Sequence, residues 1–158
     1  MKYVIIGNST AALYAVEGIR SVDKKGKITI VSDEKHPAYG RPLISYYLYG
    51  KTDLEHIAYR PADFYEKMGV DLILGERAVK IEPKEKRVLL QSGKKAGYDK
   101  LLVATGSRPF VPPMEGLEEV ENKFSFMKLD DALALEKALS PEKDVLIVGA
   151  GLIGLKCM

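Results

Sequence analysis

The pattern of apolar and polar positions predicts regular secondary structure from the first residues of the chain. Residues 2–7, KYVIIG, form a mostly apolar run that ends at a glycine, and residues 9–20, STAALYAVEGIR, carry apolar side chains at helical spacing. After a polar turn, residues 28–31, ITIV, form a second apolar run. The order predicts a strand, a helix and a second strand, which together make a βαβ unit.

The middle of the chain predicts two short helices and then a change to β structure. Helices are expected in residues 44–50 and 61–69, where apolar residues recur every three or four positions before a glycine. A strand is expected in residues 69–75. Residues 78–83 and 86–93 are β-rich and joined by a charged turn, so they predict an antiparallel ribbon.

The last third predicts a strand, a linker and the start of a second nucleotide-binding unit. Residues 98–106, YDKLLVATG, predict a buried central strand. Residues 108–116, RPFVPPMEG, are the expected linker because proline interrupts both helices and central strands. A helix is predicted in residues 129–140, with acidic residues in its first turn as the helix dipole favours. Residues 145–155, VLIVGAGLIGL, predict another strand and helix.

The two ends of the chain resemble each other. When Gly7 is aligned with Gly149, YVIIGNSTAAL lies over VLIVGAGLIGL, at an offset of 142 residues. This spacing has the size of a domain and is much longer than a solenoid repeat. The sequence therefore predicts two related turns, each suited to a dinucleotide.

Composition narrows the classes of function. The 158 residues are 46% hydrophobic and 29% charged, with a formal net charge of +2 and no basic stripe, which disfavours disorder, nucleic acid and anionic membrane. Cys157 is the only cysteine, and His36 and His56 are the only histidines, so neither an internal disulfide nor a cysteine or histidine metal cluster is expected. A cytoplasmic location is the expectation.

The first glycine turn, GNSTAA, has the spacing of a pyrophosphate-binding fingerprint. Gly7 lets the chain turn sharply out of the strand, Ser9 is small enough for close backbone approach, and Ala12 lets the helix pack near the strand. Thr10 and Ala11 lie between them at the expected helix N-terminus. An ordinary buried turn between strand and helix is the alternative for this stretch.

An acidic residue follows the second predicted strand. Asp33 lies 21 positions after Ala12, where a carboxylate can accept hydrogen bonds from a ribose diol, and Glu34 is the second candidate for that role. Solvated turn acids are the alternative. Small residues also end the strand at 98–106, and Ala104, Thr105 and Gly106 would lie at the carboxyl edge of the sheet, where ligands of such folds bind.

The ordered motifs resemble a known family. The GxSxxA turn, the acid after the second strand, HPAYGRPLISYYL, ATGSRP and the following GxGxxG together resemble the pyridine nucleotide-disulfide oxidoreductases. In these flavoproteins an FAD domain is interrupted by an NAD(P)H domain. The resemblance implies an α/β fold: a Rossmann-like FAD-binding domain, with a parallel sheet and an antiparallel ribbon, followed by the start of a second, NAD(P)-binding Rossmann unit.

One segment resembles the ferredoxin, rubredoxin and nitrite reductase branch, which commonly shows Y-x-R-P-x-L-S-K. The pattern is kept at four positions and departs at two, where Ile44 replaces leucine and Tyr46 stands in place of lysine; the four kept are Tyr39, Arg41, Pro42 and Ser45. Met127 also departs, standing about where relatives carry an arginine facing the FAD phosphates.

The resemblance also implies which residues bind the cofactors. Arg41, Pro42 and Tyr46 would approach FAD, and Val79 would touch its adenine end through the backbone. In the ATGSRP motif, Ala104, Thr105, Gly106 and Arg108 would also contact FAD. The second turn, for NAD(P)H, contains Gly149, Gly151 and Gly154. Plainer roles are open for several: a surface arginine for Arg41, packing for the tyrosines, an ordinary strand residue for Val79 and a strand cap for Thr105.

Cysteine usage separates this chain from the disulfide-reducing relatives. Those enzymes place reactive cysteines in the helix after the first βαβ unit, and residues 35–60 contain none. Cys157 lies in the second nucleotide helix, where burial is expected. A thiol–disulfide mechanism is therefore disfavoured, and no catalytic side chain is assigned.

The resulting interpretation is the N-terminal part of an FAD-dependent NAD(P)H oxidoreductase that passes electrons to a protein or small acceptor. Residues 1–113 would be the first FAD segment, and residues 114–158 a crossing segment and the start of the NAD(P)H domain. The chain alone is expected to be inactive. A stand-alone nucleotide-binding or interaction module and a flavin monooxygenase are the alternatives, and a homo-oligomer is left open.

Overall fold

The computed structural model describes residues 1–157, which form two compact units. Unit 1 contains residues 1–39 and 58–106, and unit 2 contains residues 40–57 and the chain from residue 107 onward. The units group residues that pack on one another. The boundary expected at residue 113 concerns which cofactor each segment holds, and it stays a prediction.

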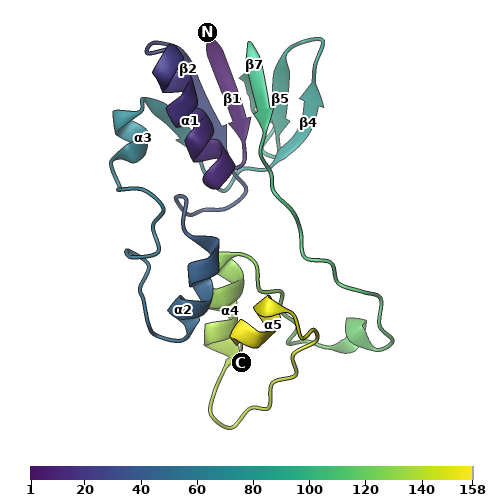
Figure 1. The fold of residues 1–158 in the computed structure, drawn as a ribbon. Helices are drawn as coiled ribbons and strands as arrows, with labels where there is room; N and C mark the ends of the chain where they lie inside the picture. Colours follow the sequence, from purple (N-terminus) through teal and green to yellow (C-terminus); the bar gives the residue numbers. More distant parts are fainter. Residues whose placement is uncertain (158) are drawn as a thin grey trace. The chain divides into compact units, whose positions relative to one another are not determined.

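Unit 1 is built on a four-stranded parallel sheet in the order β3-β2-β1-β7 (Figure 1). Its strands are β1 (Lys2–Ile6), β2 (Lys27–Val31), β3 (Val70–Ile73) and β7 (Lys100–Val103). Helix α1 (Thr10–Val22) connects β1 to β2, which lie side by side with Val4 opposite Thr29. The predicted βαβ unit is therefore confirmed.

Strand β7 lies at an edge of this sheet within the described residues, so its prediction as a central strand was wrong. It pairs with β1 alone, and Val103 is 56% exposed. The apolar run LLV indicates that the strand is suited to burial on both faces, but a strand becomes central only when a second strand pairs with its other edge. Local sequence does not encode that pairing.

An antiparallel ribbon of three strands accompanies the sheet: β4 (Ala78–Glu82), β5 (Arg87–Leu90) and β6 (Lys95–Gly97). The first two were predicted. Strand β6 was missed because its three residues, KAG, carry little apolar pattern. The β4–β5 register shifts between Ala78 and Lys80, so Val79 is an extra residue in a β-bulge.

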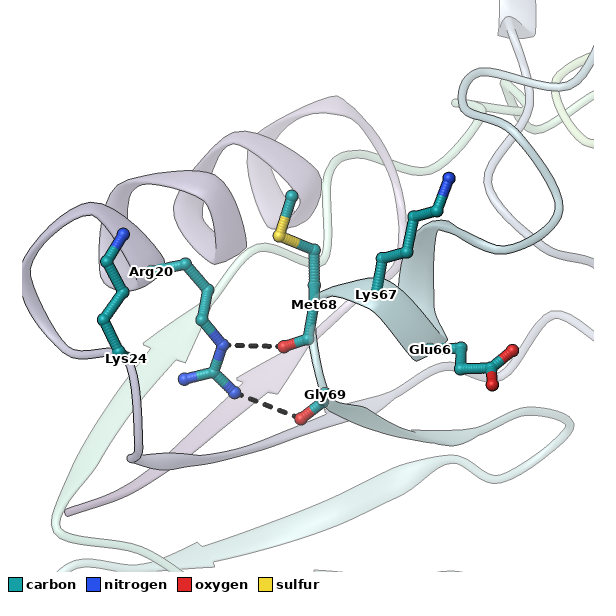
Figure 2. A pocket seen from close by; sticks show the side chains of 6 residues that line it. All are labelled: Arg20, Lys24, Glu66, Lys67, Met68 and Gly69. Carbon is teal, nitrogen blue, oxygen red and sulfur yellow. Dashed lines mark hydrogen bonds between the residues drawn. The ribbon is translucent and has the colours of Figure 1, made fainter.

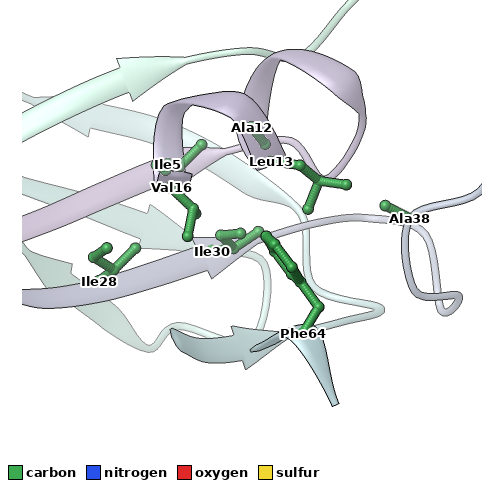
Figure 3. Close-up of a cluster of buried hydrophobic side chains, with 8 residues drawn as sticks. All are labelled: Ile5, Ala12, Leu13, Val16, Ile28, Ile30, Ala38 and Phe64. Carbon is green, nitrogen blue, oxygen red and sulfur yellow. The ribbon is translucent and has the colours of Figure 1, made fainter. Parts of the chain in front are cut away.

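Alternation along the parallel strands produces two hydrophobic layers, one on each face of the sheet. Ile5 and Ile30 pack with Leu13 and Val16 of α1 and with Phe64 of helix α3 (Phe64–Lys67), as Figure 3 shows. On the other face, the central side chains of β1 and β2 pack against the ribbon through Val4, Ile6, Val31, Val88 and Leu90. Unit 1 is therefore a helix–sheet–ribbon sandwich.

Arg20 joins three segments of unit 1 beside a surface hollow of about 370 Å³ (Figure 2). Its guanidinium donates to the carbonyl oxygens of Met68 at 2.6 Å and Gly69 at 3.1 Å, and to those of Asp23 and Gly26. With four carbonyl partners, the guanidinium holds the end of α1 to β2 and β3. We assign it a structural role.

In residues 40–57 and 107–157, the described part of unit 2, the chain forms three α-helices and two 3₁₀ turns. They are η1 (Arg41–Leu43), α2 (Ile44–Leu48), η2 (Leu117–Glu119), α4 (Leu129–Ala138) and α5 (Leu152–Cys157). Asp131, in the first turn of α4, caps the helix N-terminus, because its carboxylate accepts hydrogen bonds from the N–H groups of Met127 at 2.8 Å and Lys128 at 2.9 Å. Helices α2 and α4 are linked by a 3.0 Å bond from the Tyr47 hydroxyl to Glu136.

The strand predicted at the start of the second glycine turn is not formed. Residues 145–148 have no strand assignment, and Leu146 is 88% exposed. Within residues 1–157 no strand pairs with this segment, and an apolar run becomes a strand only when a neighbour takes up its backbone N–H and C=O groups. The helix predicted after the turn is formed, as α5.

Candidate functional site

The turn between β1 and α1 requires glycine at its first position. Gly7 has φ +110°, and its N–H donates to the Val31 carbonyl oxygen at 2.8 Å. A Cβ at this position would collide with the carbonyl oxygen of Ala104 and lie 2.7 Å from its carbonyl carbon. The turn thus brings the ends of β1, β2 and β7 into contact. The positive φ of Gly7 gives the sharp turn out of β1, and pyrophosphate binding at this turn stays a prediction.

The N-terminus of α1 is free of side-chain caps. Ser9 precedes the helix with an extended backbone, and the first intrahelical bond runs from the Leu13 N–H to the Ser9 carbonyl oxygen at 3.1 Å. The helix geometry leaves the N–H groups of its first turn, at Thr10, Ala11 and Ala12, without intrahelical acceptors. With no acidic side chain in that turn, the positive end of the helix dipole can receive an anion such as a pyrophosphate.

Close packing behind this turn depends on small residues. Ala12 is fully buried against the sheet, whereas Thr10 and Ala11 are exposed. The Ala104 N–H continues the ladder by donating to the Ile6 carbonyl oxygen at 2.8 Å. Thr105 and Gly106 follow as exposed residues, and a Cβ at Gly106 would meet open space. The structure therefore places the predicted strand end beside the predicted turn.

The two acids after β2 differ in accessibility. Asp33 is exposed, whereas Glu34 is 8% exposed and accepts a 2.6 Å hydrogen bond from the hydroxyl of Tyr39. The backbone of Glu34 is also fixed, because its carbonyl oxygen accepts the Gly75 N–H at 3.0 Å. Asp33 is therefore the better placed of the two for a ligand that arrives from solvent.

The ribbon residue expected to act through its backbone is the bulge residue. Val79 has no cross-strand partner in the β4–β5 register, and its side chain is exposed. A bulge releases backbone polar groups from the ladder, which is what a backbone contact requires. The sequence offered no signal of the bulge.

Among the predicted FAD residues of unit 2, Arg41 and Pro42 lie in η1, Tyr46 lies in α2, and Arg108 lies in the segment that follows residue 106. Arg41 donates to the Met127 carbonyl oxygen at 3.2 Å, Pro42 is exposed in η1, and Arg108 is exposed after the ATG segment. Tyr46 is 45% exposed and lies beside a hollow of about 160 Å³, where the Lys156 ammonium lies 5.6 Å from its ring centroid. Lys156 of α5 thus places a cation over the ring of Tyr46, the residue that stands where the family pattern has a lysine; the sequence analysis did not predict this contact.

The second glycine turn repeats the geometry of the first. Gly149 has φ +119°, close to that of Gly7, and the Leu155 N–H donates to the Gly151 carbonyl oxygen at 3.0 Å, as Leu13 does to Ser9. A Cβ at Gly154 would collide with the Gly149 carbonyl oxygen, so close packing requires glycine there. The equivalence expected at an offset of 142 residues therefore extends to backbone conformation.

The sequence analysis did not single out Asn8 or Tyr65, which lie beside the first turn. The Tyr65 hydroxyl of α3 donates to the Asn8 side-chain oxygen at 2.9 Å and accepts the Ala38 N–H at 3.0 Å. No sequence signal marked Tyr65, because its approach to residue 8 depends on the packing of α3 beside the sheet.

The cysteine considered in the sequence analysis, Cys157, is partly buried in α5, and burial raises the pKa of its thiol.

Comparison with known proteins identifies the family. The family model described as pyridine nucleotide-disulphide oxidoreductase matches residues 1–158. The chain belongs to this family. The resemblance stated from the motifs is confirmed, and with it the α/β fold class. The family's proteins are FAD- and NAD(P)H-dependent flavoproteins, as expected for the cofactors.

The relatives are oxidoreductases much longer than this chain. Nitrite reductase [NAD(P)H] of Bacillus subtilis is 34% identical over 97% of the chain and 19% of its own length. The epsilon subunit of NADH-dependent phenylglyoxylate dehydrogenase of Aromatoleum evansii is 35% identical over 98% of the chain and 36% of its own length. The structure of NADH:rubredoxin oxidoreductase from Clostridium acetobutylicum matches with a TM-score of 0.84 at 28% identity, over 99% of the chain and 40% of its own length. The chain thus spans less than half of each.

The part of the chain that the structure describes contains no helix with both the length and the apolar composition needed to cross a bilayer.

Proposed function

We propose that this chain is the N-terminal part of an FAD-dependent NAD(P)H oxidoreductase, the longer protein being called the full-length protein below. The main support is the pair of glycine turns, one in each unit, which share a similar glycine φ and the same first helical hydrogen bond. They occur in a chain that belongs to a family of FAD- and NAD(P)H-dependent flavoproteins. One turn serves FAD and the other NAD(P)H.

In this proposal the first turn holds the ADP half of FAD. The uncapped N–H groups of Thr10, Ala11 and Ala12 face the pyrophosphate, Ser9 leaves room for it, and Asp33 accepts hydrogen bonds from the ribose. The exposed strand end after β7 lies over the same edge of the sheet. Val79 contributes backbone groups at the adenine end. Arg41, Tyr46 and Arg108 are proposed as further FAD-binding residues because the family pattern implies them.

Bound FAD would supply the redox chemistry, accepting a hydride from the nicotinamide and passing electrons onward. The residues of this chain bind and orient the cofactors, and none is assigned as an acid, base or nucleophile. The turn at Gly149, Gly151 and Gly154 holds NAD(P)H once its sheet is completed. We propose that the electron acceptor is a protein carrier or a small molecule. One structural relative is named as an NADH:rubredoxin oxidoreductase, which supports a protein carrier. We also propose a cytoplasmic location.

Two substitutions in the full-length protein test the cofactor site. Ser9→Leu should prevent close approach of the pyrophosphate, and Asp33→Asn should weaken FAD or ADP binding by about 1 to 3 kcal/mol, the range for hydrogen bonds to charged groups. Matched controls are Ser21→Leu, exposed on the same helix, and Asp71→Asn, an exposed carboxylate on β3 that pairs with Lys27. Unchanged affinity in both site variants, measured by calorimetry, would show that the site is assigned wrongly.

A second test concerns the isolated chain. Flavin is a large apolar ring system whose affinity depends on being covered, and hydride transfer requires the nicotinamide to be held against it. We therefore expect the chain alone to bind FAD weakly, to purify largely colourless and to show no NADH-dependent dye reduction above that of free FAD. A stoichiometrically yellow preparation with turnover would contradict the proposed division of labour.

A further inference from the structure

The Tyr65 hydroxyl connects two loops that lie at the carboxyl edge of the parallel sheet. It donates to the side-chain oxygen of Asn8, which directly follows Gly7 in the first turn, and it accepts the N–H of Ala38 in the loop after β2. In the proposed function these loops carry different parts of one site. The turn receives the pyrophosphate, and the loop carries Asp33 for the ribose.

On the side of the turn, Tyr65 is the group that orients the Asn8 amide. The Asn8 nitrogen, Nδ2, is buried and has no hydrogen-bond partner among residues 1–157, so the bond to Tyr65 is the one polar contact of that side chain in the described structure. Without the hydroxyl, both polar atoms of a largely enclosed amide would lack partners. The amide would then rotate or shift toward water and move the turn with it.

On the side of the loop, Tyr65 contacts a segment that is otherwise braced internally. Tyr39 bonds Glu34, the Glu34 N–H donates to Ser32 Oγ at 3.2 Å, and the Ala38 carbonyl oxygen accepts the Tyr59 N–H at 2.9 Å. The Tyr65 ring is itself fixed by edge-to-face packing on buried Phe64, with ring centroids 5.4 Å apart. One hydroxyl thus joins a braced loop to a turn that carries a poorly satisfied amide.

We propose that Tyr65 is a positioning residue that sets the spacing between the pyrophosphate turn and the ribose loop. The inference rests on the proposed function. Its consequence is specific, because a ligand that spans both loops depends on their spacing, whereas a ligand that contacts only the turn does not. Loss of the Tyr65 hydroxyl should therefore weaken the binding of a ligand that spans both loops and leave the binding of a shorter ligand almost unchanged.

The test measures binding of ADP and of inorganic pyrophosphate to the flavin-free full-length protein by isothermal titration calorimetry. Tyr65→Phe should weaken ADP binding about three- to tenfold, the equivalent of one hydrogen bond, and change pyrophosphate binding less than twofold. Asn8→Ala should weaken ADP binding similarly, and the double variant should add little, because both changes remove the same bond. Tyr3→Phe is the matched control: its hydroxyl bonds Asp23 at 3.0 Å, at the other end of β1, and ADP binding should not change.

Each outcome decides a separate point. If wild-type protein binds neither ADP nor FAD, the proposed function fails. If it binds ADP and Tyr65→Phe binds equally well, the role of Tyr65 is refuted while the proposed function stands. Equal losses in Tyr65→Phe and Tyr3→Phe, or equal losses for ADP and pyrophosphate, would show a general loss of stability or an effect on the turn alone, and would also refute the spacing role.

Discussion

The change Gly7→Ala tests whether the first turn is as constrained as its geometry indicates. At φ +110° an alanine carries backbone strain of order 1 to 3 kcal/mol. Its Cβ would also collide with the carbonyl oxygen of Ala104 and lie 3.3 Å from the Thr105 nitrogen. These are backbone atoms, and the Ala104 N–H is held by Ile6 at 2.8 Å, so they cannot rotate away as a side chain could.

Strain and overpacking together predict that Gly7→Ala lowers the free energy of unfolding by about 2 to 5 kcal/mol. This is a large part of the stability of an ordinary domain. Urea unfolding of the purified chain, followed by circular dichroism, measures this loss. The matched control is Gly18→Ala, in the same helix-containing segment: a Cβ there meets nothing within 4 Å, and alanine should stabilise α1 by up to about 1 kcal/mol. If the free energy of unfolding of Gly7→Ala lies within about 0.5 kcal/mol of wild type, the size of an ordinary surface substitution, the constraint inferred at the turn is wrong.

Three further predictions concern the core, the acid sensitivity and the C-terminal segment. Leu13→Ala, at a fully buried position between α1 and the sheet, should lower the free energy of unfolding by about 2 to 5 kcal/mol, whereas Val22→Ala at the exposed end of α1 should change it little; similar losses would contradict the packing described. The N–H groups of Gly26 and Lys25 and the Tyr3 hydroxyl lower the pKa of Asp23, so its carboxylate stabilises the fold above the unfolded-state pKa of about 4 and ceases to do so as pH falls through the lower folded-state pKa. Asp23→Asn should therefore be less stable than wild type at neutral pH, with the difference narrowing in acid, and a difference independent of pH would contradict this assignment. In hydrogen exchange, the amides of residues 145–148 should exchange much faster than those of β1 and β2, because this segment pairs with no strand in residues 1–157. Strong protection of these amides in monomeric protein would contradict this prediction.

The sequence alone determined those features that depend on neighbouring residues. Apolar runs identified β1 and β2, and apolar residues at helical spacing identified α1, because strand burial and helix periodicity leave a local pattern. Glycine at position 7 indicated a turn that only glycine can adopt, and the same signal at Gly149 identified a second turn with nearly the same φ. The order of the motifs also identified the family, which the comparison confirmed.

Tertiary structure decided what depends on partners distant in the chain. The edge position of β7, the absence of a strand at 145–148 and the bulge at Val79 all follow from which backbone pairs with which, and an apolar run does not specify its neighbour. The difference between Asp33 and Glu34 arises because Glu34 is buried and accepts a hydrogen bond from Tyr39, whereas Asp33 is exposed. Only the packing of the chain showed that Tyr65 contacts Asn8 and that Lys156 contacts Tyr46. A hydrogen bond or a cation–π contact between residues far apart in the chain leaves no pattern in the intervening sequence.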